Sequence, residues 1–413
     1  MRWLISQMEE LCDITSSKRI FAKDYVPEGV PFYRGKEIVE RFNGAGNPTT
    51  PLFITRNRFE DIAGKFGVPQ PGDILLTSVG TLGFPFLVVD EEFYFKDGNL
   101  TWFRNMKAID SKFLFYWLIS PSGKAQLRKC TIGTSQSAYT IERLKKMEVS
   151  LPPKETQRRI SSILSTYDDL IENNRRRIRL LEEAARLLYR EWFVHFRFPG
   201  HEHVKIIDGV PEGWERKRIG DFCTKIGSGA TPRGGAASYQ SKGITLIRSL
   251  NIYDYEFKDD GVVYIDEKQA KKLSNVTVET GDVLINITGA SVARCCIVPN
   301  RHLPARVNQH VMIMRPVQEI VCPEYLMCAI NSGGQKKFIL NIARAGGATR
   351  EALTKDTIAG LELIVPKRNL MKVFHSFAHV NFSQIETLEK QNHKLRAARD
   401  LLLPRLMNGE IAV

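Results

Sequence analysis

Two stretches of the chain carry a seam of mostly apolar residues at alternating intervals of four and three positions. In the first stretch the seam consists of Ile160, Leu164, Tyr167, Ile171, Asn174, Ile178, Leu181, Ala185 and Leu188. This spacing places the seam along one side of a helix, as a coiled coil requires. Pro152-Pro153 suits the start of this helix, and Phe198-Pro199-Gly200 suits its end.

The second stretch starts near Pro366 and continues to Leu403-Pro404, with a less regular seam. Asn381, Asn392 and Arg399 interrupt this seam, whose other positions are Phe374, Ala378, Ile385, Leu388, Leu395 and Leu402. A helix of about 34 residues is roughly 50 Å long, which exceeds the width of a small domain. We therefore expect the two helices to pair antiparallel as a coiled-coil rod, rather than to pack each on its own domain. Asn174 either fixes the register of this pair or is a tolerated polar position.

Short apolar runs bounded by Gly, Pro and Asp precede each long helix and predict strands. Asp73–Thr77 and Phe84–Val89 are such runs, whereas Ser111–Ile119 and Ser122–Cys130 have helical patterns. Residues 210–360 repeat this plan with different loops and a Gly-rich insert. The pattern predicts an α+β fold, in which two similar mixed domains are separated by two long antiparallel helices with internal pseudo-twofold symmetry.

The same motifs occur twice in the same order, about 210 residues apart. Trp3 matches Trp214, and Val30–Arg34 matches Ile244–Arg248. The motif Gly72-Asp73-Ile74-Leu75 matches Gly281-Asp282-Val283-Leu284. Solenoid repeats have units of roughly 20–50 residues, so a period this long indicates a duplicated domain. We expect such a protein to bind a partner that itself has two similar halves.

The charge of the chain favours a polyanionic partner. The 413 residues include 59 Lys and Arg against 46 Asp and Glu, a net charge of +13. Nucleic acids attract such an excess because binding releases phosphate counterions. The sequence has no signal peptide, lipidation signal, amphipathic basic helix or apolar run of about 18 residues. We therefore expect a nucleic acid rather than a membrane as the partner.

No catalytic or metal-binding motif is found. The seven cysteines show no C-x-x-C pair, Cys295-Cys296 suggests buried thiols, and the chain should be reduced and cytoplasmic. A Walker A motif is missing. Phe42–Gly46 resembles a methyltransferase loop for S-adenosylmethionine, but no convincing strand precedes it, which favours a surface loop. His201-Glu202-His203 has no further clustered ligands, so we predict no metal site.

The sequence resembles the specificity subunits of type I restriction-modification systems along its whole length. The residues that carry the resemblance are Leu151-Pro152-Pro153-x-Glu155-x-Gln157-Arg158-Arg159-Ile160, Asp168-x-x-Ile171-Glu172-Asn173, Gly213-Trp214, Gly229-Ala230-Thr231-Pro232, Gly281–Leu284 and Leu401–Glu410. The second helix departs from the pattern, because Pro366–Leu370 lacks the second proline and the Glu/Gln pair.

This resemblance implies a non-catalytic subunit of a prokaryotic complex, with two target recognition domains that each read one half of a split double-stranded DNA sequence. The domains would be residues 1–150 and, with a linker, 199–364. The long helices would be residues 151–198 and 365–413. Two methyltransferase (M) subunits and restriction (R) subunits would join the chain. S-adenosylmethionine, ATP and Mg²⁺ would then belong to those partners.

Polar residues at strand ends and in the Gly/Ser/Thr turns are the candidates for DNA contact. Arg and Lys suit phosphates, and short polar side chains suit base edges. For each residue a turn-stabilising role is equally open. The candidates are Arg34, Lys36, Thr77, Ser78, Thr134, Ser135, Arg233, Arg248, Asn286, Thr288 and Arg350.

Three other readings stay open at this point. The first is a related system whose methylase and nuclease share one partner chain. The second is a DNA-binding or scaffold protein outside restriction. The third is a stand-alone methyltransferase that uses the Phe42–Gly46 loop, which predicts binding of S-adenosylmethionine by the purified chain.

Overall fold

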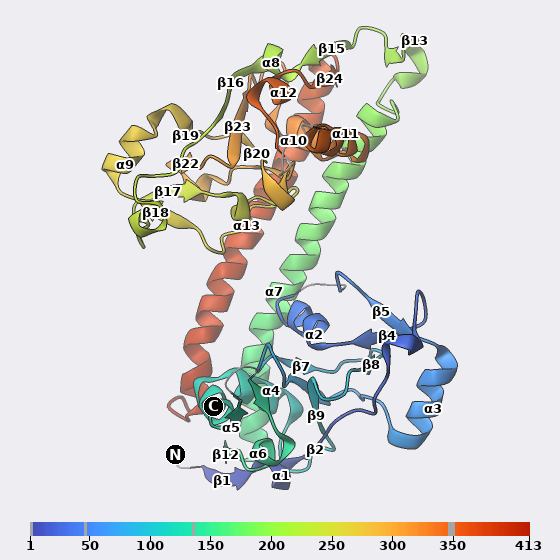
Figure 1. Cartoon of the computed structure of the whole chain (residues 1–413), viewed down its shortest axis with the longest axis vertical. Coiled ribbons are helices and arrows are strands. Elements are labelled where there is room, and N and C mark those ends of the chain that lie inside the picture. Colours follow the sequence, from blue (N-terminus) through green and yellow to red (C-terminus); the bar gives the residue numbers. More distant parts are fainter. Residues whose placement is uncertain (1–2, 45–47, 134–136, 346–351) are drawn as a thin grey trace. The chain divides into compact units, whose positions relative to one another are not determined.

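The chain forms two compact units that each combine an α+β domain with parts of two long helices (Figure 1). The computed structural model describes residues 3–44, 48–133, 137–345 and 352–413. Unit 1 comprises Met1–Arg175 with Lys390–Val413, and unit 2 comprises Arg176–Glu389. The long helices are α7 (Lys154–Tyr189) and α13 (Arg368–Met407). The expected α+β class is confirmed, and each unit contains part of both helices.

The domain of unit 1 contains two four-stranded sheets. The antiparallel sheet has the order β2 (Asp13–Thr15), β9 (Leu100–Arg104), β6 (Ile74–Thr77) and β7 (Pro85–Leu87). In the second sheet β4 and β8 are parallel, and its order is β3 (Tyr25–Val26), β5 (Leu52–Ile54), β4 (Val30–Tyr33) and β8 (Tyr94–Phe95). Two pairs complete the strands: β1 (Leu4–Gln7) with β12 (Glu148–Leu151), and β10 (Thr131–Ile132) with β11 (Ala138–Tyr139). The helices are α1 (Met8–Leu11), α2 (Gly35–Phe42), α3 (Arg56–Phe66), α4 (Ser111–Ile119), α5 (Pro121–Cys130) and α6 (Ile141–Lys145).

Unit 2 repeats this topology. Its antiparallel sheet has the order β16 (Cys223–Ser228), β23 (Val311–Pro316), β20 (Val283–Asn286) and β21 (Cys295–Ile297). The order of the second sheet is β18 (Val263–Ile265), β17 (Ile244–Ile247), β22 (Ala305–Val307) and β19 (Thr277–Val278), with β17 and β22 parallel. The paired strands are β15 (Glu215–Arg218) with β24 (Glu362–Val365), and β13 (Ile206–Ile207) with β14 (Val210–Pro211). The helices are α8 (Ile219–Phe222), α9 (Glu267–Lys272), α10 (Pro323–Asn331), α11 (Gly333–Ala345) and α12 (Lys355–Ala359).

The two domains differ at one edge of the second sheet. In unit 1 the additional strand β3 pairs with β5, whereas in unit 2 the additional strand β19 pairs with β22 at the opposite edge. The other strands of the two four-stranded sheets correspond one to one, as does the pair β1–β12 with β15–β24, whereas the pairs β10–β11 and β13–β14 occur at different places in the two units. The sequence repeat therefore reflects a duplicated fold whose core sheets are kept and whose edges differ.

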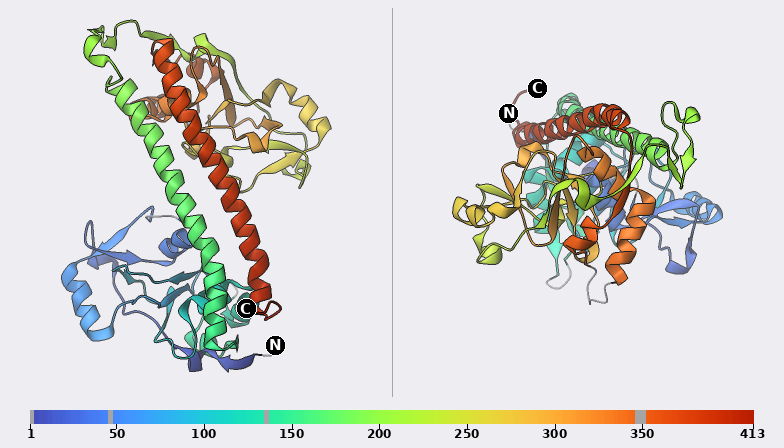
Figure 2. Two further views of the ribbon diagram at one scale, coloured as in Figure 1. Left: turned by 180° about the vertical axis from the view of Figure 1, so that it is seen from behind. Right: turned by 90° about the horizontal axis from the view of Figure 1, so that it is seen from above.

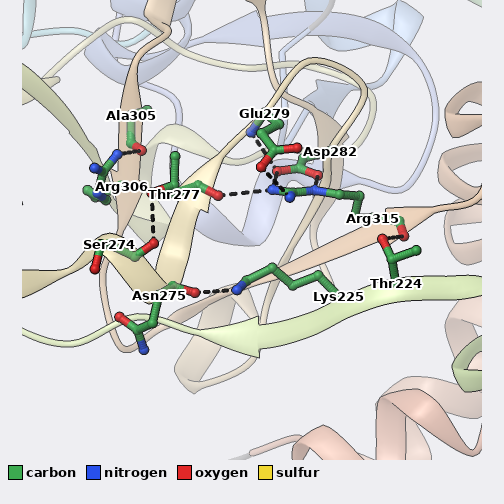
Figure 3. Close-up of polar contacts among 10 residues, drawn as sticks. All are labelled: Thr224, Lys225, Ser274, Asn275, Thr277, Glu279, Asp282, Ala305, Arg306 and Arg315. Atoms are coloured by element: carbon green, nitrogen blue, oxygen red, sulfur yellow. Dashed lines mark hydrogen bonds and ion pairs between the residues drawn. The ribbon is translucent and has the colours of Figure 1, made fainter.

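The repeated Gly-Asp motif is a structural element of this framework. Asp282 accepts hydrogen bonds from the backbone N–H of Glu279 at 2.7 Å and from Arg315 at 2.7 and 2.8 Å (Figure 3). In unit 1 Asp73 accepts from the backbone of Gln70 at 2.9 Å and from the indole of Trp102 at 2.8 Å. Burial raises the pKa of both carboxyl groups above the ordinary value. These bonds satisfy a buried carboxylate and fix the turn that leads into β6 or β20.

The ends of the long helices depart in part from the expectation. Helix α7 follows Pro153 and ends at Tyr189. A π-helical turn, Arg190–Val194, comes directly after it, so the helical segment stops before the expected end at Phe198. Helix α13 begins at Arg368, runs through Pro404 and ends at Met407, so it continues past the Leu403-Pro404 segment where the apolar pattern stopped. Leu403, Leu406 and Met407 are buried in the core of unit 1. This burial outweighs the single helical hydrogen bond that a proline removes.

Within each unit the two long helices run antiparallel. In unit 1 the amide of Asn174 donates to Asn392 at 3.0 Å, and Arg399 pairs with Asp168. In unit 2 the amide of Asn381 donates to the backbone oxygen of Leu181 at 3.4 Å. Figure 2 shows both helices from behind. The residues that interrupt the second seam in the sequence are therefore contacts between the helices.

The seam residues are largely shielded from solvent. The buried ones are Ile160, Leu164, Ile171, Asn174, Ala185, Phe374, Ala378 and Leu388, and the half-buried ones are Tyr167, Ile178, Leu181, Leu188, Ile385, Leu395 and Leu402. Ile160 and Leu164 pack in the core of unit 1, and Phe374 packs in the core of unit 2. Among the described helices, none combines the length and apolar character that crossing a membrane needs.

Candidate nucleic-acid interface

Three loops converge where strand β6 ends in unit 1. The backbone N–H of Ser78 donates to Asn99 at 2.8 Å, and that of Tyr139 donates to Ser78 at 2.9 Å. Val79 forms a β-bridge with Ala138. The segment that follows β6 is thereby fixed to the loop before β9 and to the segment after the Gly/Ser/Thr turn.

The corresponding loops converge in unit 2. Thr288 forms a β-bridge with Ala352, and the backbone N–H of Ile287 donates to His310 at 3.0 Å. The candidates Thr134, Ser135 and Arg350 lie outside the described residues. In sequence they adjoin the segments that form these bridges. Both domains thus bring equivalent loops to the ends of equivalent strands.

A continuous set of hydrogen bonds links the side chains at this surface of unit 2. The hydroxyl of Thr231 donates to Gln309 Oε1 at 2.6 Å, Gln309 Nε2 lies 3.0 Å from His310 Nε2, and His310 Nδ1 lies 2.6 Å from Thr288 Oγ1. We call these four residues the polar chain. Gly229 allows the Thr231 loop to approach, because a Cβ at residue 229 would lie 1.7 Å from the backbone oxygen of Val307.

The polar chain can form hydrogen bonds with a polar ligand. Its hydroxyl, amide and imidazole groups offer both donors and acceptors, and the amide of glutamine matches the edge of adenine. Gln309 and Thr231 are exposed, and the bonds to their neighbours fix the orientation of both side chains. Sequence reasoning named Thr288 but missed Gln309 and His310. The available signal was their position after the short apolar strand β22.

Several of the predicted contact residues bond within their own domain. The guanidinium of Arg34 pairs with the buried Glu37, with Nε at 3.1 Å from Oε2. Thr77 is buried and accepts from the backbone of Phe84 at 2.9 Å, and Ser78 is buried beside Thr101 at 2.7 Å. These three side chains stabilise turns in this structure, which is the alternative that the sequence left open.

Arg248 and Asn286 are similarly placed in unit 2. Asn286 is buried, and its amide donates to the backbone oxygen of Ser249 at 2.9 Å. Arg248 is half-buried over the ring of Tyr239 at 5.2 Å and donates to the backbone oxygen of Gly261. The bond from Asn286 joins the end of β20 to the residue that follows Arg248 after β17.

A group of exposed cations lies on and near helix α9 of unit 2, beside the exposed Asp266 and Glu267. Arg233 is exposed, and its backbone oxygen accepts from Gln269 of α9 at 2.9 Å. Lys268, Lys271 and Lys272, which all belong to α9, are also exposed. We call Arg233 and these three lysines the α9 basic cluster; sequence reasoning missed its lysines. In unit 1 the exposed Lys36 donates to Thr50 at 2.9 Å.

The structure gives the local conformation around two sequences that resembled cofactor or metal motifs. Phe42 is the last residue of α2, so a helix rather than a strand precedes the Gly-rich loop. His201–His203 forms an exposed 3₁₀ turn. The adjacent Cys295 and Cys296 are buried thiols, as expected.

The fold and this surface define a two-domain recognition protein, in which one framework carries two sets of strand-end loops. The family model of the type I restriction modification DNA specificity domain matches residues 2–183 and again 211–395. The chain belongs to this family. It is therefore the DNA-specificity component of a restriction-modification system and not a catalytic subunit.

Individual relatives agree with this assignment. The type I restriction enzyme MjaIX specificity subunit of Methanocaldococcus jannaschii is 27% identical over 356 residues, which cover 83% of this chain and 78% of the relative. The HindI specificity subunit of Haemophilus influenzae is 23% identical over 408 residues, covering 83% and 87%. The crystal structure of a type I S subunit from M. genitalium has the same fold, with a TM-score of 0.63, 16% identity and coverage of 98% and 96%.

Proposed function

We propose that this specificity subunit selects a split double-stranded DNA target, with each domain reading one half. The observation that carries the proposal is the convergence of equivalent loops at equivalent strand ends in both domains. The loops themselves differ: unit 2 has the Gly229–Pro232 segment and the polar chain, whereas unit 1 has helix α2 after β4. One framework with two different reading surfaces suits two different half-sites.

Phosphate binding in unit 2 would fall to the α9 basic cluster, and base reading to the polar chain. Lysines on a short exposed helix supply the sequence-independent part of the affinity. The exposed amide of Gln309 supplies directional hydrogen bonds, which can distinguish one base pair from another.

We further propose that the two long helices set the number of unread base pairs between the half-sites. Helix α7 has 36 residues and α13 has 40. At 1.5 Å per residue these helices are about 54 Å and 60 Å long, against about 34–36 Å for one turn of B-DNA. Helices of this length are sufficient for a spacer of that order.

Two M subunits would dock on exposed apolar residues of the helices, and R subunits would complete the nuclease. On α13, Val373, Phe377 and Val380 are exposed, while Phe374 and Ala378 between them are buried. Trp214, Leu370 and Val373 line a neighbouring apolar groove of about 360 Å³. An exposed apolar surface of this kind is typical of a partner site. S-adenosylmethionine, ATP and Mg²⁺ would remain with the partners.

Methylome sequencing of a host that expresses this chain with its M subunits tests the proposal. We expect one split motif with a spacer of fixed length. Exchanging residues 1–150 for a homologous domain should change one half of the motif only, and a change in both halves would contradict independent reading. Deleting seven residues from both helices should shorten the spacer by about 3 base pairs.

A further inference from the structure

A cluster of metal-ligating side chains lies where helix α10 meets helix α13 in unit 2. The Sγ atom of Cys322, a carboxylate oxygen of Glu324 and a ring nitrogen of His375 all lie within 4.8 Å of one another. Cys322 precedes the first residue of α10, and Glu324 lies in the first turn of that helix. Both residues are buried, and His375 reaches them from α13.

A second histidine extends the cluster. His375 Nδ1 lies 2.9 Å from one oxygen of Glu324, and His379 Nδ1 lies 3.0 Å from the other. The two histidines are four residues apart on α13, a spacing that places two imidazoles on one face of a helix. Glu324 is only 4% exposed, so its carboxylate depends on these neighbours.

The equivalent position in unit 1 has a different chemistry. There Asp110 precedes α4, its backbone N–H donates to Gln157 of α7 at 2.7 Å, and the hydroxyl of Ser161 donates to its carboxylate at 3.2 Å. If Ile160 of α7 is aligned with Phe374 of α13, then Gln157 corresponds to Met371 and Ser161 corresponds to His375. The same junction is thus hydrogen-bonded in unit 1 and composed of sulfur, imidazole and carboxylate in unit 2.

We infer that Cys322, Glu324 and His375 form a binding site for a zinc-class transition metal ion, and that His379, which contacts only Glu324 of these three, rotates in as the fourth ligand. Thiolate, imidazole and carboxylate are the ligands that zinc takes in proteins, most often four in a tetrahedron. The thioether sulfur of Met371 lies 3.7 Å from Cys322 Sγ and adds to the soft surroundings that favour such ions over Mg²⁺ or Ca²⁺.

The side chains must rearrange slightly to bind the ion, because the imidazole nitrogens lie 2.9 and 3.0 Å from the Glu324 oxygens while the three clustered ligand atoms spread over up to 4.8 Å. Metal–ligand bonds of about 2.0–2.3 Å place tetrahedral ligand atoms roughly 3.5 Å apart. The half-buried His375 and the exposed His379 can supply this movement by side-chain rotation, because their surroundings leave them room. On binding, the Cys322 thiol loses its proton to solvent, and each imidazole presents a lone pair in place of its N–H donor.

Such an ion would fasten the second domain to its long helix. Two of the ligands belong to the start of α10 and two to α13, so the ion would join these elements directly. The inference does not depend on how the domain reads DNA.

Metal loading of the purified full chain tests this site. After chelation and reloading, we expect one zinc ion per chain by elemental analysis, and Co²⁺ should give a thiolate-to-cobalt charge-transfer band. The midpoint of thermal unfolding should rise with zinc. Cys322→Ser should abolish the cobalt band, and His375→Gln should weaken binding by more than about tenfold, since each removes a ligand.

Matched variants keep the test decisive. The double variant His201→Gln/His203→Gln removes the exposed His-Glu-His turn and should keep full metal binding. His379→Gln changes an exposed side chain, so it should fold normally without metal by circular dichroism and still bind zinc more weakly. The site is refuted if the cobalt band is missing in the wild type, or if Cys322→Ser and His375→Gln retain zinc. Glu324 would then be a buried carboxylate satisfied by protons on the two imidazoles.

Discussion

Asn174 and Asn392 form a side-chain hydrogen bond of 3.0 Å between the two long helices, and both side chains are buried. A shift of the helices along each other would leave two buried amides without partners. Polar pairs at a single seam position fix register in coiled coils for this reason. The contact favours the register role for Asn174 over that of a tolerated polar residue.

Replacing one member of this pair should destabilise unit 1. We expect Asn174→Ala to lower the free energy of unfolding by about 1–3 kcal/mol, because Asn392 keeps its desolvated amide without a partner. The double variant Asn174→Leu/Asn392→Leu should recover most of the loss. Urea unfolding of both single variants and the double variant measures the coupling, and Asn173→Ala on the exposed side of α7 is the control. Additive effects of the two single changes would contradict the register role.

Asp168 connects the domain of unit 1 to both helices. It accepts from the hydroxyl of Tyr116 at 2.6 Å and from Arg399 of α13. We expect Arg399→Met to cost about 1–2 kcal/mol of stability, since hydrogen bonds to charged groups are worth about that much and the pair is partly exposed. A double-mutant cycle with Tyr116→Phe should be non-additive. Lys394→Met, at an exposed position of the same helix, should have no measurable effect.

Glu389 should make unit 2 less stable as pH rises. Burial raises the pKa of Glu389 from 4.5 to about 7, although Arg301 lies 3.0 Å away. A raised folded-state pKa means that the native state holds the proton more tightly. The resulting stabilisation is full below pH 4.5 and is lost as pH rises to about 7.

The variant Glu389→Gln tests this dependence. It should match the wild type near pH 5 and exceed its stability near pH 8 by at most a few kcal/mol, since one pKa unit corresponds to about 1.4 kcal/mol. Unfolding midpoints across this range provide the measurement. Glu386→Gln, which changes the neighbouring carboxylate 4.0 Å from Arg301, is the matched control. Identical pH profiles of the wild type and Glu389→Gln would refute the prediction.

The α9 basic cluster and the polar chain should affect DNA binding in different ways. Lys271→Ala should weaken binding to all sequences and reduce the slope of log affinity against log salt by about one. Gln309→Ala should instead relax the preference at one base pair by about 1–3 kcal/mol. Anisotropy titrations of the complex with M subunits over a range of salt measure both. Lys337→Ala on α11 changes an exposed lysine outside the cluster and should leave both unchanged.

The sequence predicted the features that rest on local or periodic signals. The Gly-Asp turns preceded the expected strands β6 and β20, and α4 spans the predicted Ser111–Ile119. The seams located both long helices because an apolar stripe is visible without knowledge of the partner. The continuation of α13 past Pro404 could not be read from the stripe, since the burial of Leu406 depends on the distant core of unit 1.

Features that depend on pairs distant in sequence were not predictable. In the sequence, Asn392 and Arg399 interrupt the apolar seam of the second helix. Hydropathy does not reveal that Asn392 bonds to Asn174 and Arg399 to Asp168. Cys322 and His375 show no ligand spacing, since the fold alone brings them together. Thr77 looked accessible at a strand end, yet its side chain is buried within the turn that follows.

The division of the chain into units has a consequence for its synthesis on the ribosome. Unit 2 is one continuous stretch, Arg176–Glu389, whereas unit 1 also needs Lys390–Val413. Leu403, Leu406 and Met407 fill the same core as Met8 and Phe113. Domains generally fold in the order in which they emerge, but the core of unit 1 can be completed only after Leu403, Leu406 and Met407 have been synthesised, which is later than the last residue of unit 2. Substitutions near residue 406 should therefore destabilise the N-terminal domain, although they lie at the other end of the sequence.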